Sequence, residues 1–538
     1  MRAADQSKAP AGRNGLRPGI MLLFAILFLL AVVIHGDYGI SWDEPNQRFT
    51  GAVATKNLAE RFAPGLVTNE AARLPPLKDY VDRDHGTGFE LPAAALEAIL
   101  GLRDKRDIYM FRHLLTFAVC FLGAIAVFRL ASRRFEDWRL GLLAVLFLVL
   151  SPRLFAESFY NSKDAVFMSA FALGMTTAIS FIEAPAIGTA LLFAAATAFA
   201  VDVRIMAVAL PVVATAALAA RLARRELALR PTLAAWAFCM AATVAFIVAG
   251  WVWLWSNPVE NLVEAFSSMA RFRWRGDVLF MGKLVPGDAL PASYVPVWIA
   301  LTTPPLYLVL FVVGLGGILC TLIRRGAALW RGSGELQDLI FVALFAGPIL
   351  SVMLLHSVLY GGWRHLYFVY PALLLICVRG WQTIWNSGPW PLPRRAVLVA
   401  ATLASMVAIA GWMWRAHPLQ NVYFNVVAGS NVRAKFDLDY WGLGNRIALE
   451  YILRHDPRPS ISVGPASETP VENSFDMVEP SLRQRLRQPG DGALADYLID
   501  NYYGVRSVGA ETIARHYSTF YEHKIDGEII FSIYKLKE

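Results

Sequence analysis

The sequence predicts a mainly α-helical membrane protein, a polytopic transmembrane bundle of about eleven spans with a small extracytoplasmic α/β domain at the C-terminus. Of the 538 residues, 56% are hydrophobic and only 17% are charged, whereas soluble domains devote about 25% of their residues to charge. The hydrophobic residues gather in runs long enough to cross a bilayer. Lys and Arg gather in the short segments between those runs, which is typical of cytoplasmic loops.

The charge and the cysteines exclude two other classes of protein. The formal net charge of +8 follows from the basic loops, so it indicates membrane topology rather than nucleic-acid binding. The four cysteines all fall inside apolar runs, so no disulfide framework and no thiolate metal site is predicted.

The first apolar run, Gly19 to Ile34, follows Arg13 and Arg17. No small-residue cleavage site comes after it, so we expect a retained first span rather than a removed signal peptide. The predicted spans are 19–34, 111–130, 140–151, 165–182, 187–201, 205–220, 232–254, 303–323, 338–356, 366–379 and 395–414.

The basic loops determine the predicted orientation. Lys and Arg cluster at residues 133–139, 221–230, 324–331 and 379–395. These loops lie on one side of the membrane if the spans alternate, and the positive-inside bias makes that side cytoplasmic. The side of the membrane predicted for each later loop depends on whether the chain turns back at Glu183-Ala184-Pro185. This tight turn carries no basic residue. We expect a multi-pass protein of the bacterial inner (plasma) membrane, with the N-terminus cytoplasmic and the C-terminus outside.

The segments on the other side are 35–110, 152–164, 255–293 and 360–365. In the first, the amphipathic stretch Phe89 to Leu102 predicts a helix along the membrane surface. We therefore divide the chain into a transmembrane module, residues 1–414 with 35–110 as the first outer loop, and a C-terminal domain, 415–538.

The C-terminal domain changes character after Asp456. Two short β-rich runs, Ile461–Val463 and Ile529–Tyr534, are separated by a polar stretch that contains proline. This pattern is typical of a small α/β domain.

Two adjacent acids follow the first span, in Trp42-Asp43-Glu44-Pro45. A carboxylate in a partly dry pocket can act as a general base, and its neighbour can bind substrate. The other interpretation is that Asp43 or Glu44 caps a helix begun by Pro45.

A second polar group, Asn161-Ser162-Lys163-Asp164, precedes the fourth span. Asp164 also suits the positive end of a helix. Lys163 is a cation on the outer face, against the inside bias, and can bind a phosphate as a point charge.

Two further groups contain arginine. Asp202 and Arg204 interrupt an apolar run, which marks either a functional site or a mutual ion pair. Arg364 and His365 open the tenth span. Arg364 offers a planar fork to phosphate oxygens, although both residues are also suited to anchor a span at the interface.

Acids and cations thus gather on one predicted face of the bundle. Transfer of a glycosyl group from a phosphate needs a base for the acceptor and cations for the departing phosphate. We predict catalytic roles for Asp43, Glu44 and Asp164. The predicted phosphate-binding residues are Lys163, Arg204, Arg364 and His365. Candidates to line the pocket are Trp42, His85, Asn161 and Tyr294.

The chain resembles the integral-membrane GT-C glycosyltransferases. Within them it is similar to bacterial members of the dolichyl-phosphate-mannose protein mannosyltransferase family, glycosyltransferase family 39. The residues that carry the resemblance are Trp42-Asp43-Glu44, the run from Phe159 to Asp164, the run from Arg364 to Pro371, Tyr423-Phe424-Asn425, and the run from Asp439 to Gly442. The resemblance implies that Asp43 is the base of an inverting transfer and that the sugar donor is a polyprenyl-phosphate monosaccharide.

Several alternatives stay open at this point. The acceptor is a glycolipid, an envelope polysaccharide or a protein, because 255–293 and the tail do not resemble the inserts of the eukaryotic protein mannosyltransferases. We predict no metal site and no certain cofactor, although some relatives use a divalent metal. We also predict no nucleic-acid partner. The rival hypotheses are a lipid-linked-sugar flippase or transporter, and a membrane-anchored scaffold that displays its C-terminal domain.

Overall fold

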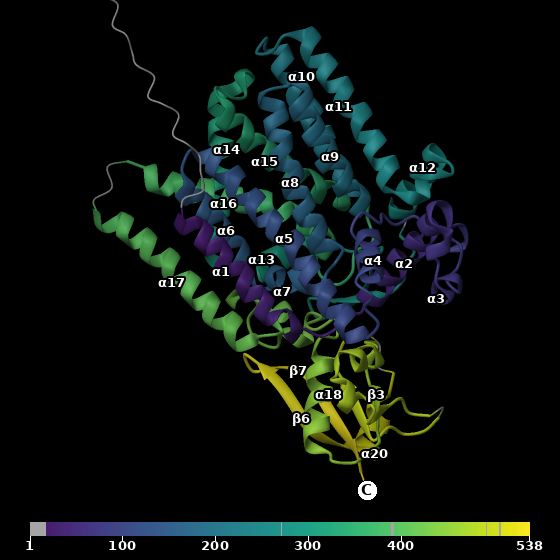
Figure 1. Ribbon diagram of the computed structural model, residues 1–538. Helices are drawn as coiled ribbons and strands as arrows, with labels where there is room; N and C mark the ends of the chain where they lie inside the picture. Colours follow the sequence, from purple (N-terminus) through teal and green to yellow (C-terminus); the bar gives the residue numbers. More distant parts are fainter. Residues whose placement is uncertain (1–17, 271, 389–391, 491, 505–506, 538) are drawn as a thin grey trace, which may run out of the picture.

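The computed structural model describes residues 18–270, 272–388, 392–490, 492–504 and 507–537. Long helices run roughly side by side, and a small sheet with its own helices lies at one end of them (Figure 1). Arg13 and Arg17, which entered the topology prediction, lie outside the described residues.

Every predicted span coincides with a helix. These helices are α1 (Pro18–Ile34), α5 (Lys105–Phe135), α6 (Trp138–Val149), α8 (Asp164–Glu183), α9 (Ile187–Val203), α10 (Ala209–Ala223), α11 (Leu229–Gly250), α14 (Pro305–Arg325), α15 (Ser333–Leu354), α16 (Tyr370–Asn386) and α17 (Leu392–Ala416).

Within the described residues, nine helical stretches are long and apolar enough to cross a membrane, and a bent pair of helices makes up to ten. The one predicted span that is not among these stretches, 187–201, falls on α9, an apolar helix of only 17 residues. The chain is thus a multi-pass integral membrane protein, and the predicted fold class is confirmed.

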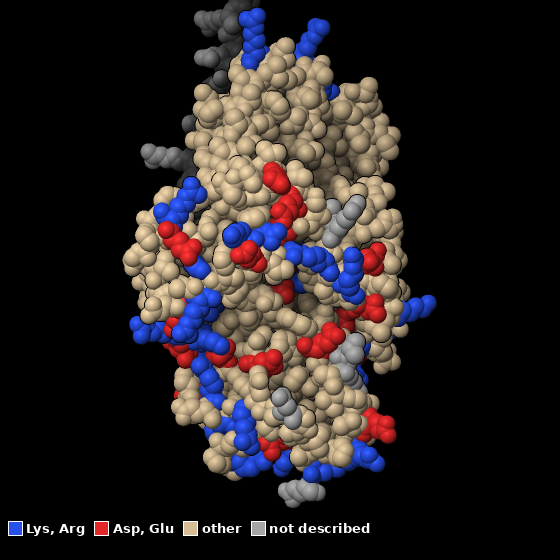
Figure 2. Space-filling model, turned by 90° about the vertical axis from the view of Figure 1, so that its right-hand side faces the viewer, with Lys and Arg blue, Asp and Glu red and all other residues tan. Residues whose placement is uncertain are grey.

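The helices differ in how much of their surface is buried inside the protein. In α8, 78% of the most apolar window is buried inside the protein, whereas the corresponding share is 22% in α11, α14 and α17. Apolar side chains such as Val244, Val312 and Val407 are exposed, as expected of a surface in contact with lipid. Figure 2 shows one side of the molecule, whose upper part is almost free of charge apart from Lys and Arg at its top end.

The segment 152–164 differs from the prediction of a short outer loop. It contains α7 (Pro152–Tyr160), which is bent by 72° from α6 and is buried at every residue. Pro152 suits the first turn of a helix, where a missing N–H costs nothing. Apolar side chains such as Phe155 and Phe159 then pack in the core. This buried helix brings residues 157–161 to the site described below.

The first outer segment folds into α2 (Glu44–Phe62), α3 (Asn69–Ala72) and α4 (Glu90–Ile99). The predicted amphipathic helix is present as α4. Arg112 of α5 forms buried ion pairs with Glu90 and Glu97 of α4. These pairs fix α4 to the outer end of the bundle.

The segment 255–293, predicted as a loop, contains α12 (Pro258–Ala270) and a hairpin of β1 (Asp277–Phe280) and β2 (Lys283–Pro286). α13 (Tyr294–Thr302) follows. The hairpin lies against the chain after α17, because Phe280 bridges Phe436 and the Gly282 N–H donates to the Lys435 carbonyl.

The C-terminal part has α18 (Gly444–His455), α19 (Pro480–Arg483), α20 (Ala510–His516) and a five-stranded mixed sheet of order β4-β3-β5-β7-β6. Its strands are β3 (Ile461–Pro465), β4 (Leu486–Arg487), β5 (Tyr497–Asp500), β6 (Tyr517–Ile525) and β7 (Glu528–Leu536). β3 is parallel to β4 and β5, and β7 is antiparallel to β5 and β6. Both predicted strand segments are therefore strands.

Candidate functional site

Asp43 and Arg364, 321 residues apart in the chain, form an ion pair at one end of the bundle. Nη1 of Arg364 donates to Oδ2 of Asp43 at 2.6 Å. The Asp43 side chain is 34% exposed, whereas that of Arg364 is 5% exposed. Asp43 is therefore the partner that a substrate can reach.

The Asp43 side chain does not cap a helix. Asp43 occupies the N-cap position of α2, but its side chain makes no capping hydrogen bond. Burial raises the pKa of Asp43, but Arg364 and Lys163 outweigh burial and hold that pKa below its usual value. Asp43 is thus a carboxylate at neutral pH.

Asp164 connects two arginines. It begins α8, where a negative charge is favoured by the helix dipole, and it is 1% exposed. One carboxyl oxygen pairs with Arg204, at the end of α9, and the other lies 3.6 Å from Nη1 of Arg364. Asn161 fixes this acid by accepting a hydrogen bond from the Asp164 N–H at 2.7 Å.

Lys163 is a cation without an acidic partner among the described residues. Its Nζ lies 3.4 Å from Nδ1 of His85. Burial and the neighbouring charge of Arg204 lower the pKa of Lys163 to about 8. Burial and the charge of Lys163 also lower the pKa of His85 well below its usual value, so the imidazole is neutral and can accept a hydrogen bond from the ammonium group.

Aromatic rings enclose the guanidinium of Arg364. Its central carbon lies 4.7 Å from the ring centre of Tyr360 and 4.5 Å from that of Trp441, which are distances for cation–π contact. His365 packs edge-on against Tyr360 at 4.7 Å, and its buried Nδ1 has no hydrogen-bond partner. Nε of Arg364 is also buried without a partner.

Glu44 does not face the same way as Asp43. It is 3% exposed, accepts from the Ser41 N–H at 2.6 Å, and lies 2.9 Å from Nε2 of His113 in α5. Among the described contacts, Glu44 thus closes the turn before α2 and forms no ion pair with Arg364 or Lys163.

The other predicted pocket residues have separate surroundings. The Trp42 ring meets that of Tyr503, from the C-terminal part, edge-on at 5.9 Å. Tyr294 is 2% exposed, and its hydroxyl donates to the Gly362 carbonyl at 3.2 Å. Tyr294 thus supports the turn before Arg364, and it also lines a small pocket of about 60 Å³.

A buried carboxyl group absent from the predictions lies next to the site. Glu157 of α7 is 0% exposed and accepts hydrogen bonds from the hydroxyls of Tyr367 and Tyr440 at 2.9 and 3.1 Å. Asn161 donates to it at 2.7 Å. The network joins α7, the turn before α16 and the segment after α17.

Some of these residues had a signal in the sequence. Tyr367 and Tyr440 belong to the runs that carry the family resemblance. Glu157 did not stand out, because the sequence of α7 is too short and too polar to be recognised as a buried helix. One interpretation of the sequence was an ion pair between Arg204 and Asp202. In the structure, Arg204 pairs with Asp164 instead.

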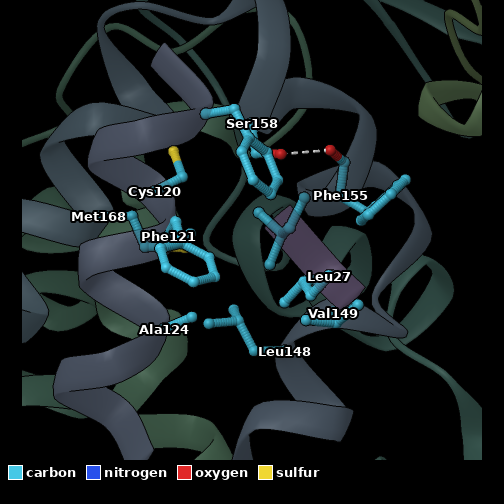
Figure 3. A pocket seen from close by; sticks show the side chains of 11 residues that line it. Leu27, Cys120, Phe121, Ala124, Leu148, Val149, Phe155, Ser158 and Met168 are labelled. Atoms are coloured by element: carbon cyan, nitrogen blue, oxygen red, sulfur yellow. Dashed lines mark hydrogen bonds between the residues drawn. The ribbon is translucent and has the colours of Figure 1, made fainter. Parts of the chain in front are cut away.

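Within the described ranges, no group of three or more His, Cys, Asp or Glu side chains is arranged to hold a metal ion. A small pocket between α1, α5, α6, α7 and α8 also lacks ligand chemistry (Figure 3). Its volume is about 40 Å³, and its one polar side chain, Ser158, donates to the Phe155 carbonyl. An apolar space of this size stays dry and is too small for a lipid chain.

No family model matches the sequence, and no curated protein sequence matches it. Solved structures with a similar arrangement include ArnT from Cupriavidus metallidurans bound to undecaprenyl phosphate, at 14% identity and a TM-score of 0.47, covering 96% of this chain and 98% of that one. The Archaeoglobus fulgidus oligosaccharyltransferase in the apo form is 12% identical, with a TM-score of 0.41 and coverage of 96% of this chain and 74% of that one. Similarity at this level assigns the chain to no family.

Proposed function

We propose that this protein is a GT-C-type glycosyltransferase that moves a monosaccharide from a polyprenyl-phosphate donor to an acceptor on the extracytoplasmic face of the membrane. One observation supports this proposal most strongly. At one end of the membrane bundle, the accessible carboxylate of Asp43 lies beside Arg364 and near Lys163, a cation without an ion-pair partner among the described residues. These are the two kinds of group that transfer from a phosphate requires.

The cations are suited to the donor phosphate. Arg364 presents a guanidinium held between two aromatic rings, so little freedom is lost when it binds an oxyanion. Lys163 supplies a second positive charge, and it forms no direct ion pair with an acid in the described structure. Arg204 and Asp164 position Arg364. Arg204 pairs with one carboxyl oxygen of Asp164, and the other oxygen lies near the buried guanidinium of Arg364.

Asp43 is suited to the acceptor. The acceptor hydroxyl oxygen attacks the anomeric carbon while the bond from that carbon to the phosphate oxygen breaks. The electron pair leaves with the polyprenyl phosphate, and the hydroxyl proton passes to Asp43. Attack opposite the leaving phosphate inverts the anomeric configuration.

Donor binding strengthens this base. In the empty site, Arg364 lowers the pKa of Asp43 and so weakens it as a base. A phosphate that shares the guanidinium takes part of that positive charge. The basicity of Asp43 therefore rises when the donor is bound, which couples proton removal to the presence of the leaving group.

The proposal extends to family and location. The motif order supports similarity to glycosyltransferase family 39. The acceptor class is an envelope glycolipid, an envelope polysaccharide or a protein. We place the site outside the bacterial inner membrane, with the N-terminus cytoplasmic. Residues 415–538 form the C-terminal domain of this proposal, and Tyr440 and Trp441 of that domain contact the site.

The second candidate function is a lipid-linked-sugar flippase. Such a protein needs polar groups along a path through the bundle. Here Asp43 and Lys163 directly precede helices, Asp164 begins α8, Arg204 follows α9, and Arg364 begins the short 3-10 helix before α16. A cluster at one end supports an enzyme rather than a path.

The function is tested by comparing envelope glycolipids and glycoproteins by mass spectrometry, with and without the gene. Purified protein in proteoliposomes is then given a labelled polyprenyl-phosphate sugar and the candidate acceptor. A transferase releases polyprenyl phosphate and labels the acceptor. Movement of intact donor between leaflets, without release of polyprenyl phosphate, would identify a flippase instead.

A further inference from the structure

A groove separate from the charged cluster lies between α2, α4, α9 and α11. Its volume is about 360 Å³, within the range of about 300 to 1,000 Å³ typical of ligand pockets. Most of its wall is apolar, with Leu58, Leu91, Phe199, Phe246, Val252 and Trp255 among the lining residues.

Asp202 of α9 lies in this groove without a partner. It is 4% exposed, and its Oδ1 is buried with no hydrogen bond among the described residues. Arg204, the partner that the sequence offered, is paired with Asp164 instead. Leaving a buried carboxyl group unsatisfied is costly, so a ligand that hydrogen-bonds to it gains free energy.

Thr87 provides a second unsatisfied group in the same wall. It is 4% exposed, its Oγ1 is buried with no hydrogen-bond partner in the part of the chain that the structure describes, and it lines the groove with Asp202. A carboxyl group and a hydroxyl together can accept from and donate to one alcohol group. Among the described residues, the lining of the groove includes no Lys or Arg. The groove therefore offers a phosphate no cation, and Asp202 and Thr87 select a hydroxylated head instead.

The mouth of the groove faces the membrane side of the protein. Ala195, Phe246 and Ala249, from α9 and α11, are exposed and line the groove. α11 lies on the side of the molecule seen in Figure 2, where the surface of the upper part is almost uncharged. A lipid chain can therefore lie along α9 and α11 while its head enters the groove.

The groove and the charged cluster share one wall. His85 contacts Lys163 of the cluster, and three residues later the Gly88 N–H donates to the Asp202 carbonyl at 2.8 Å. A molecule in the groove is thus separated from the cluster only by the short segment 85–88.

We infer that this groove binds the hydroxylated head of a membrane-inserted glycolipid through Asp202 and Thr87. That this glycolipid is the acceptor rests on the proposed function. The inference selects the glycolipid from the three acceptor classes named there. Binding itself does not depend on transfer.

The test uses the full-length protein in lipid nanodiscs, without sugar donor, and an alkyl glucoside that carries a diazirine in its chain. Irradiation should label α9 or α11, as read by mass spectrometry of peptides. Asp202→Leu should reduce labelling about tenfold, because the buried hydrogen bond from the head group to the carboxyl group is lost. Ala249→Trp, which fills the mouth, should reduce it similarly. Ala245→Trp is the matched control, because Ala245 is exposed on α11 but does not line the groove.

Equal labelling of the Ala249→Trp and Ala245→Trp proteins would overturn the inference, as would equal labelling of wild type by a phosphate-headed probe of the same chain. The acceptor assignment has its own readout. Ala249→Trp should lose transfer while donor binding is unchanged, and normal transfer would contradict it. Specific labelling in a protein with no transferase activity would leave the groove in place and refute the proposed function alone.

Discussion

Replacement of Arg364 by lysine keeps the positive charge but removes the planar fork and its contacts with two rings. In the structure, the guanidinium donates to Asp43 at 2.6 Å and lies against Tyr360 and Trp441. A hydrogen bond to a charged group contributes about 1.5–3 kcal/mol, and a desolvated cation–π contact contributes about 2 kcal/mol. If about 3 kcal/mol of this is lost in the transition state, kcat/KM falls about 100-fold.

The assay is release of polyprenyl phosphate by proteoliposomes that contain equal amounts of folded wild-type or Arg364→Lys protein. Arg153→Lys is the matched control. Arg153 is also buried and stacks on Trp298 and Phe424, but it lies outside the acid cluster and bonds to a backbone carbonyl. Turnover of Arg364→Lys equal to that of Arg153→Lys would refute the role of the guanidinium at the phosphate.

Three further predictions follow from the site and its topology. Because the pKa of Lys163 is about 8, its charge is lost as pH rises through that value, so donor affinity should fall between pH 7 and 9. Lys163→Arg should bind donor equally at both pH values, and a parallel fall in that variant would exclude Lys163 as the titrating group. Glu157→Gln should lower the free energy of unfolding by about 2 kcal/mol. Oε1 accepts from both tyrosine hydroxyls and Oε2 accepts from Asn161, so an amide N–H must replace an acceptor at one of these positions. Unchanged melting of purified protein would show that this network is not stabilising. A reporter active only in the cytoplasm, fused after Glu538, should be silent, and a bright fusion would invert the proposed topology.

The fold was predictable where one physical signal dominated. Apolar runs of spanning length identified every described helix that is long and apolar enough to cross a membrane, because a bilayer demands continuous apolar surface. The segment 152–160 was missed because its burial comes from neighbouring helices and not from its own hydropathy. The hairpin after α12 was missed for a similar reason, since contacts with residues 434–437 hold it in place.

The candidate site was predictable in its residue types but not in its pairing. Asp43, Asp164, Arg204 and Arg364 stood out as polar groups at span ends, and the structure joins them by ion pairs. Sequence neighbours gave wrong partners, because adjacent residues at a turn point in different directions. Glu44 therefore bonds to His113 and not to the site beside Asp43.

The central claim, that Asp43 is the base of a glycosyl transfer, is tested most directly by the Asp43→Asn variant. Asn is about as good an N-cap as Asp, and the Asp43 side chain makes no capping bond, so the variant should fold normally. A positioned base contributes about a hundred- to ten-thousand-fold to rate, so transfer in proteoliposomes should fall by at least about 100-fold. Donor binding should be retained or tighter, because Arg364 is released from its ion pair. Near-normal transfer by Asp43→Asn would contradict the account.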